Sequence, residues 1–341
     1  MSEIHKIHLQ LMNKEITCTD LVQEKLTLLK ENTHNTVNAF LDTLALELAA
    51  KVDAKIAKGE EIGLLEGIPF GIKDVYMVQG TYTTASSNLL KKYKSPYTAT
   101  AIQKLLDAGA IPLVKENCDS FGHGSSSENT IFGAVKNAVN SDLVGGGSSG
   151  GSAVNVAKDF TVFSIGGDTG GSISQKAGYN KVLGFKPTYG RISRHGLLAY
   201  ASSFDQIGIF APETQDVAIV LEVIAGSDDY DSTASEKKVV SYNEASEDAL
   251  VKKKIAYLDC YVDHEGIDEE VRVKTLSVIE QLKKEGHQVD KISFEFLDEM
   301  VPTYYVLTTA EASSNLARFD GIHYGYRSPN ATDLESTYKL S

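Results

Sequence analysis

Two glycine-serine clusters constrain the fold of this chain more than any other feature of its sequence. The first, GGGSSGGS, runs from Gly145 to Ser152, and the second, GGDTGGSIS, runs from Gly166 to Ser174. The apolar segment between them, residues 153–165, has the pattern of a helix followed by a strand. Because glycine tolerates positive φ and close backbone approach, we expect two tight turns held against each other by regular structure, not one flexible linker.

Composition and charge limit the class of protein. A length of 341 residues allows about two domains or one large α/β domain. The hydrophobic content of 42% and the charged content of 23% are typical of a globular protein with a core. The net charge of −13 argues against direct binding of nucleic acid, which requires a basic surface. We therefore expect any contact with RNA to come through a partner.

The cysteines and the N-terminus indicate a soluble, cytoplasmic protein. Cys18, Cys118 and Cys260 are far apart and form no CxxC pair, so neither a disulfide framework nor a cysteine zinc site is expected. His5 and His8 have i, i+3 spacing, but nothing else in the sequence supports a metal site. The N-terminus is too charged for a signal peptide, and no apolar run approaches the ~18 residues of a membrane span.

Helical and strand patterns alternate along most of the chain. The first sixty residues are predicted to be helical, with Thr19 and Asp20 capping one helix and Gly59 ending another that begins near residue 38. The first helix places Leu21, Val22, Leu26 and Leu29 on one face. Strands are predicted at 111–116, 160–165, 182–187, 254–258 and 287–294, and helices at 98–110, 214–226 and 268–286. The alternation predicts a three-layer α/β/α fold with a central mixed sheet flanked by helices.

The first cluster fits several structures when taken alone. It satisfies G-x-G-x-x-G through Gly145, Gly147 and Gly150, but a dinucleotide fingerprint should follow an apolar strand, and KNAVNSDLV precedes this one. It is not a P-loop, because no GK[ST] follows. A catalytic loop and a tight structural turn remain equally consistent with it.

The second cluster favours chemistry more strongly. Gly170 and Gly171 lead directly into Ser172, which places backbone N–H groups around one hydroxyl, as an oxyanion hole requires. A helix cap is the commoner role for such a serine. A serine nucleophile also needs a base, yet neither His123 nor His195 has an obvious aspartate partner, and G-x-S-x-G is absent.

Lys73 is an alternative base, because it follows the apolar run GIPFGI. Desolvation lowers the pKa of a lysine, and a neutral lysine can accept a proton from a hydroxyl. For Lys73 alone, a side chain that snorkels from a strand end is the commoner interpretation. Tyr304 and Tyr305, which precede a predicted helix, suit the core or a pocket wall better than catalysis.

Taken together, GIKD at Lys73, GGSSGGS at Ser148 and GDTGGS at Ser172 resemble the amidase signature family of Ser-Ser-Lys hydrolases. The spacings of 75 residues from the lysine to the first serine and 24 residues between the serines agree with that family. Residues 124–133, 186–208 and 311–325 further resemble its branch of glutamyl-tRNA(Gln)/aspartyl-tRNA(Asn) amidotransferase A subunits. The resemblance covers nearly the whole chain and implies the amidase signature fold.

The resemblance implies a role for each motif residue. Ser172 is then the nucleophile that attacks the side-chain amide of glutamine, Ser148 is the bridging serine, and Lys73 is the terminal base. Ser148 is expected to precede its neighbour in an unusual cis arrangement. The N–H groups of Thr169, Gly170, Gly171 and Ser172 are expected to form the oxyanion hole. Gly124, Ser125, Asp168, Tyr304 and Tyr305 are the implied substrate-binding residues.

The resemblance also implies partners. An acyl-enzyme would release ammonia and water would then free glutamate, and the ammonia would pass to a partner in a complex with amidotransferase subunits B and C. No ATP-binding motif occurs here, so we expect no cofactor in this chain. By the resemblance, the partner uses ATP and magnesium and also carries most tRNA contacts. The product would be Gln-tRNA(Gln), Asn-tRNA(Asn) or both. The alternatives are a stand-alone amidase of another small amide and an inactive or truncated scaffold protein of the complex.

Two departures from the family pattern bear on the site. The family has arginine directly after GGSI and proline two residues later, where this chain has Ser174 and Lys176. We expect the loss of that arginine to leave Asp168 without its charge partner, with Lys176 compensating in part. The family's chains also continue beyond residue 341, so this chain is expected to be truncated or to have an incomplete site.

These expectations define a single amidase signature domain over residues 1–341. It would comprise an N-terminal helical segment (1–60), a catalytic core (61–226) and a partial C-terminal portion (227–341). The polar stretch 227–251 is the best candidate for a surface excursion, and residues 328–341 are predicted to lack a closing element.

Overall fold

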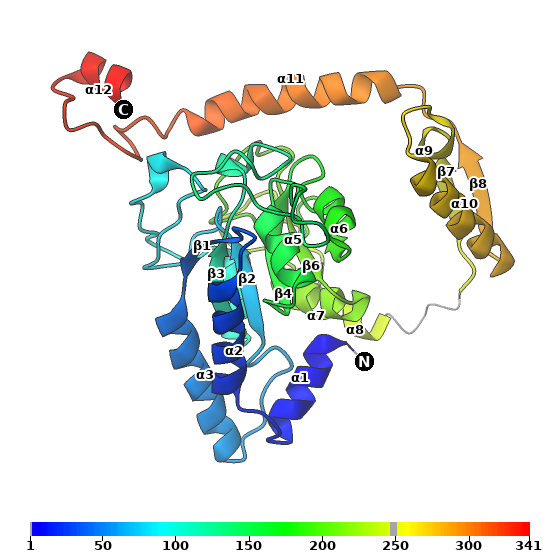
Figure 1. Cartoon of the computed structure of the whole chain (residues 1–341), viewed down its shortest axis with the longest axis horizontal. Helices are drawn as coiled ribbons and strands as arrows, with labels where there is room; N and C mark the ends of the chain where they lie inside the picture. Colours follow the sequence, from blue (N-terminus) through cyan, green and yellow to red (C-terminus); the bar gives the residue numbers. More distant parts are fainter. Residues whose placement is uncertain (1, 246–250) are drawn as a thin grey trace. The chain divides into compact units, whose positions relative to one another are not determined.

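The computed structural model describes residues 2–245 and 251–341, and the chain divides into two compact units. We call Met1–Asn243 with Ala310–Ser341 the main unit, and Glu244–Thr309 the small unit. Figure 1 shows the elements of both. The single domain expected over residues 1–341, with segments bounded at 60 and 226, stays a prediction.

The main unit is built on a six-stranded sheet of order β1-β3-β2-β4-β6-β5. Strand β2 runs parallel to both β3 and β4, and the remaining pairs are antiparallel. The strands are β1 (Val37–Phe40), β2 (Pro69–Lys73), β3 (Ile111–Glu116), β4 (Phe163–Asp168), β5 (Leu183–Phe185) and β6 (Gln206–Ala211). The sheet is therefore mixed, as predicted.

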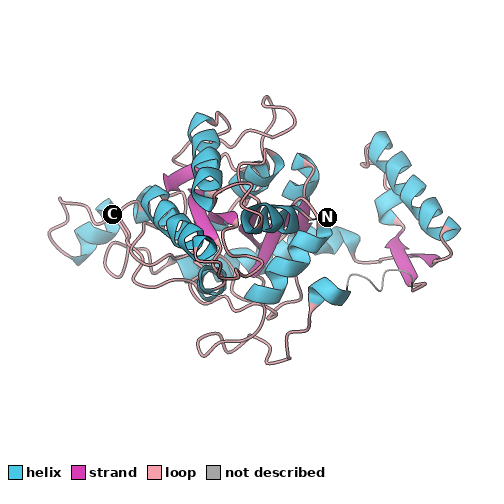
Figure 2. Cartoon of the chain, turned by 90° about the horizontal axis from the view of Figure 1, so that it is seen from below, coloured by secondary structure: helices cyan, strands magenta, loops and turns pink. Residues whose placement is uncertain are grey.

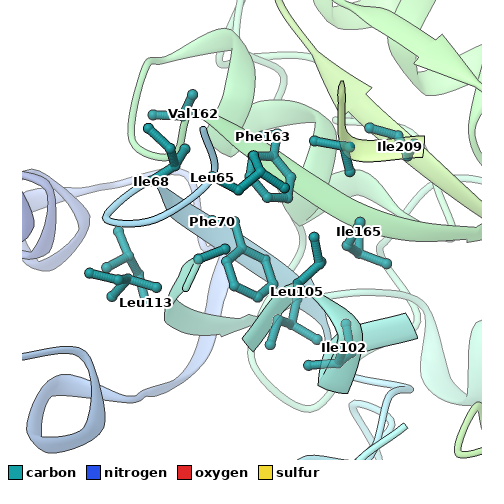
Figure 3. Packing of buried hydrophobic residues seen from close by; sticks show 14 of the residues in the cluster. Leu65, Ile68, Phe70, Ile102, Leu105, Leu113, Val162, Phe163, Ile165 and Ile209 are labelled. Carbon is teal, nitrogen blue, oxygen red and sulfur yellow. The ribbon is translucent and has the colours of Figure 1, made fainter. Parts of the chain in front are cut away.

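Helices cover both faces of this sheet. Helix α5 (Gly150–Ala157) packs against β2, β4 and β6 on one face and against α6 (Ser174–Asn180). On the other face, Phe70 stacks on Phe163 with ring centroids 5.1 Å apart, and α4 (Thr100–Asp107) supplies Ile102 and Leu105 to the same cluster (Figure 3). Helix α7 (Thr214–Ile224) packs on α4. This confirms the three-layer α/β/α prediction, and Figure 2 shows the strands (magenta) among the helices (cyan).

The N-terminal segment is mainly helical, with two differences from prediction. Helix α1 spans Glu3–Met12, α2 Cys18–Glu31 and α3 Asp42–Ala57. The residues predicted to line one face of the first helix are buried in α2: Leu21, Val22, Leu26 and Leu29. However, the α2 cap is Thr17, whose Oγ1 accepts from the Asp20 N–H at 3.0 Å, so Thr19 and Asp20 lie inside the helix. Residues 37–40 form β1 instead of the start of the second predicted helix, because they pair with β3 at the sheet edge.

The small unit contains the two-stranded parallel sheet of β7 (Lys254–Leu258) and β8 (Gln288–Ile292), with α10 (Glu269–Lys284) between them in sequence. The three elements lie within their predicted ranges, but a separate sheet was not predicted. The 310 helices η1 (Asn88–Leu90) and η2 (Ser120–Gly122) lie in the main unit. The remaining helices are α8 (Tyr242–Ala245), α9 (Cys260–Asp263), α11 (Leu297–Leu316) and α12 (Leu334–Leu340).

The end of the chain differs from prediction. Residues 328–341 do contain a closing element, α12, which begins at a capping box between Asp333 and Ser336. Of the polar stretch 227–251, residues 246–250 lie outside the described residues. Across residues 2–245 and 251–341, no helix has the length and apolarity needed to cross a membrane.

Candidate active site

The three residues singled out from the motifs lie together at one edge of the main sheet. Lys73 is the last residue of β2, Ser148 precedes α5, and Ser172 lies in the loop after β4. Because β2 and β4 are parallel, their carboxyl ends meet at the same edge, and α5 begins there. The topology therefore explains why motifs 75 and 24 residues apart converge.

Hydrogen bonds connect the three side chains in a line. Lys73 Nζ lies 2.6 Å from Ser148 Oγ, and Ser148 Oγ lies 3.2 Å from Ser172 Oγ. The Ser148 N–H also donates to Ser172 Oγ at 3.2 Å. All three residues are buried, with Ser172 the most exposed at 7%. A proton can therefore pass between Ser172 and Lys73 through one intermediate hydroxyl without entering solvent.

The cis peptide bond lies between Gly147 and Ser148, so it precedes Ser148 and does not follow it as expected. Gly147 is confined at this point. A Cβ there would lie 1.9 Å from Asp119 Oδ2 and 2.4 Å from the Ser127 nitrogen. The first cluster therefore needs glycine before Ser148 because backbone and carboxylate close over that position.

Lys73 is fully buried, and burial lowers its pKa. Desolvation is the largest cause, and the nearby Cys118, Asp119, Asp168 and Asp205 oppose it. A lowered pKa raises the fraction of the amine that is neutral, and only the neutral amine can accept a proton. Because the side chain is enclosed, the snorkelling alternative considered for Lys73 does not apply.

Ser149 is a site residue that the sequence motifs did not single out. Its Oγ lies 2.9 Å from Lys73 Nζ and donates to the Gly167 carbonyl at 2.9 Å. It therefore provides Lys73 with a second hydroxyl partner beside Ser148 and links β2 to β4. The signal was present, since Ser149 follows Ser148 in the same cluster, but the pattern does not distinguish the two serines.

Asp168 organises the loop that carries Ser172. Its two carboxylate oxygens accept from the N–H groups of Gly171 and Ile173, both at 2.8 Å. Where an arginine partner was expected, the partners of Asp168 are thus two backbone N–H groups. As a consequence, the Gly171 N–H is engaged here and is not available to an oxyanion as predicted. Lys176 forms no ion pair with Asp168 among the described residues, and its ammonium points to the Gly171 carbonyl instead.

A small pocket, with a cavity volume of about 20 Å³, opens beside this array. Asp168 and Thr169 line it, together with Tyr200 and Asp205, which the sequence motifs did not select. The buried Asp205 accepts from Thr169 Oγ1 at 2.6 Å and from the Tyr200 N–H at 2.8 Å. Burial raises the pKa of Asp205, and these hydrogen bonds oppose that shift. The pocket thus places a further carboxyl beside the serine relay.

The other predicted substrate residues occupy different positions. Gly124 packs against Asp119, whose Cγ would lie 2.3 Å from an added Cβ. Ser125 offers its carbonyl to the Gly147 N–H at 2.7 Å, so both residues support the first cluster. Tyr304 and Tyr305 lie within α11, in the small unit, with ring centroids 5.5 Å apart. Their role in binding substrate remains a prediction.

No group of three or more histidine, cysteine, aspartate or glutamate side chains that could hold a metal ion occurs in the described parts of the chain. The buried relay of hydroxyls and an amine, the pocket beside it and the α/β/α scaffold define a serine hydrolase-like site. The family described as Amidase matches residues 19–340, and this chain belongs to that family.

Curated relatives and a solved structure refine the comparison. The chain is 46% identical over 308 residues to the A subunit of glutamyl-tRNA(Gln) amidotransferase from Koribacter versatilis, covering 89% of this chain and 64% of that protein. It is 44% identical to the protein of the same name in Nostoc sp. strain PCC 7120, covering 99% of this chain and 71% of that protein. The crystal structure of the A subunit of glutamyl-tRNA(Gln) amidotransferase from Thermotoga maritima matches with a TM-score of 0.72 and 35% identity, covering 86% of this chain and 66% of that one. This chain thus spans about two thirds of the length of these relatives.

Proposed function

We propose that this chain is the glutaminase subunit of a tRNA-dependent amidotransferase. The observation that carries the proposal is the continuous hydrogen-bonded line from the buried Lys73 through Ser148 to Ser172. Membership of the amidase family and the similarity to proteins named as the A subunit of glutamyl-tRNA(Gln) amidotransferase support it.

In the proposed reaction, neutral Lys73 takes the proton of Ser148 as Ser148 takes the proton of Ser172. The Ser172 oxygen attacks the side-chain amide carbon of glutamine and forms a tetrahedral oxyanion. We assign its stabilisation to the N–H groups of Thr169, Gly170 and Ser172, since Asp168 holds that of Gly171. The proton returns along the relay to the departing nitrogen, which leaves as ammonia.

In the second half of the reaction the same relay activates water. Lys73 and Ser148 draw a proton from water, whose oxygen attacks the Ser172 ester and releases glutamate, and the proton returns to Ser172. The sum is glutamine plus water to glutamate plus ammonia. We propose that the ammonia is consumed in a cytoplasmic complex with amidotransferase subunits B and C, where the partner uses ATP and magnesium and binds most of the tRNA.

The test is ammonia release from glutamine by the full chain, alone and with candidate partner subunits. Ser172→Ala should lower kcat about 10⁴-fold or more, because a nucleophile and its base act as one unit. Lys73→Met should cause a similar loss. Ser227→Ala, at an exposed serine of the main unit, is the matched control and should keep full activity.

The outcomes separate the proposal from its alternatives. Stable co-purification with two partner subunits and glutamine-dependent ammonia release would support the amidotransferase. Hydrolysis of other small amides, but not of glutamine, by the chain without partners would favour a stand-alone amidase. Full glutaminase activity in Ser172→Ala would overturn the assignment of the nucleophile.

A further inference from the structure

Lys176 is a buried lysine that the proposed reaction does not use. Its side chain is 1% exposed, and no carboxylate among the described residues forms an ion pair with it. Burying an unpaired cation is costly, so its ammonium requires neutral acceptors. Those acceptors are the Gly171 carbonyl, 3.5 Å from Nζ, and Gln175 Oε1.

The position of Lys176 links the two glycine-serine clusters. Its Cγ would lie 3.2 Å from a Cβ at Gly146, so the lysine stem packs on the first cluster. Asn180 Nδ2 donates to the carbonyls of Gly145 and Lys176, at 2.8 and 2.9 Å. The stem and backbone are thus fixed to the first cluster while the ammonium reaches Gly171 in the second.

Gly171 is held from both sides. Its N–H donates to Asp168 at 2.8 Å, and its carbonyl accepts from the Gln175 N–H at 3.1 Å and faces the Lys176 ammonium at 3.5 Å. Its φ of +96° is a conformation that favours glycine. In a planar trans peptide the C=O and the following N–H point in opposite directions, so the Ser172 N–H is directed away from Lys176. The Gln175 N–H and the Lys176 ammonium together fix the Gly171 carbonyl, and the orientation of the Ser172 N–H follows from it.

We propose that Lys176 is a positioning residue that holds the Gly171–Ser172 peptide so that the Ser172 N–H serves as an oxyanion donor. The inference rests on the proposed function, because it assumes attack by Ser172. The positive charge at the carbonyl also polarises that peptide, which strengthens its N–H as a donor.

The charged groups around Lys176 make this role dependent on pH. Burial and the charge of Lys73 from β2 lower the pKa of Lys176 to about 8, while Asp168 at the end of β4 and Asp119 before η2 oppose the shift. Tyr179, on α6 itself, packs on Gly146 beside the Lys176 stem. The ammonium is therefore present near neutral pH and is lost as the pH rises through about 8. While present, it favours the neutral form of Lys73.

The experiment is the pH profile of ammonia release by Lys176→Met, assembled as the wild type is. We expect kcat to fall about 10- to 100-fold with KM nearly unchanged, less than the loss of an oxyanion donor itself. The alkaline limb should disappear, and the acid limb should move to higher pH because Lys73 loses a neighbouring positive charge. Lys176→Arg should retain activity beyond the pH at which the wild type declines, because a guanidinium stays charged.

Lys25→Met is the matched control. Lys25 is also a buried lysine bonded to a backbone carbonyl, that of Asp159 at 2.7 Å, but it belongs to α2 and also pairs with the Asp159 carboxylate at 2.8 Å. Its removal should leave the shape of the pH profile unchanged. A fluorophosphonate that titrates reactive Ser172 corrects every rate for the folded fraction.

Two results would overturn this inference while leaving the proposed function intact. One is a Lys176→Met enzyme with wild-type kcat per titrated site. The other is a lowered rate with an unaltered pH profile, which would mean that Lys176 only supports folding. Wild-type chain that neither reacts with the probe nor hydrolyses glutamine in the complex would instead refute the proposed function.

Discussion

Replacing Glu116 with glutamine should remove a pH dependence of stability that one buried carboxyl creates. Glu116 ends β3 and is completely buried. Its Oε1 accepts from Asn155 at 2.9 Å and from Ser164 at 2.7 Å. Desolvation raises the pKa of this carboxyl from 4.5 to about 7, against the pull of its hydrogen bonds.

The sign and size of the effect follow from linkage. Below pH 4.5 the carboxyl is protonated in both the folded and the unfolded chain, so its burial does not make the free energy of unfolding depend on pH. Between pH 4.5 and about 7 only the unfolded chain ionises, and the free energy of unfolding falls as the pH rises. The pKa difference corresponds to about 3 kcal/mol, and above pH 7 the free energy of unfolding is lower by this full amount.

Urea denaturation followed by circular dichroism measures this effect, and it suits a chain without tryptophan. Glu116→Gln and wild type should have similar free energies of unfolding at pH 4.5, and the variant should be more stable by up to about 3 kcal/mol at pH 8. Glu47→Gln, at an exposed position of α3, controls for the loss of one surface charge. A difference between Glu116→Gln and wild type that is the same at both pH values would refute the reasoning.

Three further predictions concern the site and the sheet beneath it. Ser149→Ala should lower kcat about tenfold with little change in KM, because Lys73 loses one of its two hydroxyl partners, and steady-state kinetics that instead show a change confined to KM would contradict this. Activity should fall as the pH drops through the lowered pKa of Lys73, because the protonated amine cannot act as base, and a pH–rate profile that is flat on the acid side would argue against that role. Gly71→Ala should destabilise the fold by several kcal/mol, since its Cβ would lie 1.8 Å from Glu116 Oε1, while Gly63→Ala, with nothing within 4 Å, should leave the melting temperature nearly unchanged.

Local patterns in the sequence predict much of the fold. The strand at 111–116 matches β3 residue for residue, because a buried apolar run between a glycine-ended helix and a polar loop has few other structures. The apolar spacing from residue 38 onward predicts a helix, and pairing of residues 37–40 with β3 overrides that local preference. Strand β6 (206–211) is not among the predicted strands, because its pairing with both β4 and β5 is non-local.

The motifs select the residues of the candidate site, but not their contacts. Motif spacing selects Lys73, Ser148 and Ser172, yet only the fold shows that Ser149 also holds Lys73. Asp168 illustrates the limit most clearly. The motif comparison leads one to expect a charged partner for Asp168, but its observed partners are two backbone N–H groups, which leave no mark on residue identity.

The central claim, that Ser172 attacks glutamine through the relay, is tested most directly by trapping the covalent intermediate. The complex is mixed with glutamine, quenched in acid within the first turnovers and digested, and the peptides are analysed by mass spectrometry. The account predicts a glutamyl ester on Ser172 that is absent from Ser172→Ala and builds up more slowly in Lys73→Met. Steady ammonia release with no adduct on Ser172, or with the adduct on another residue, would contradict it.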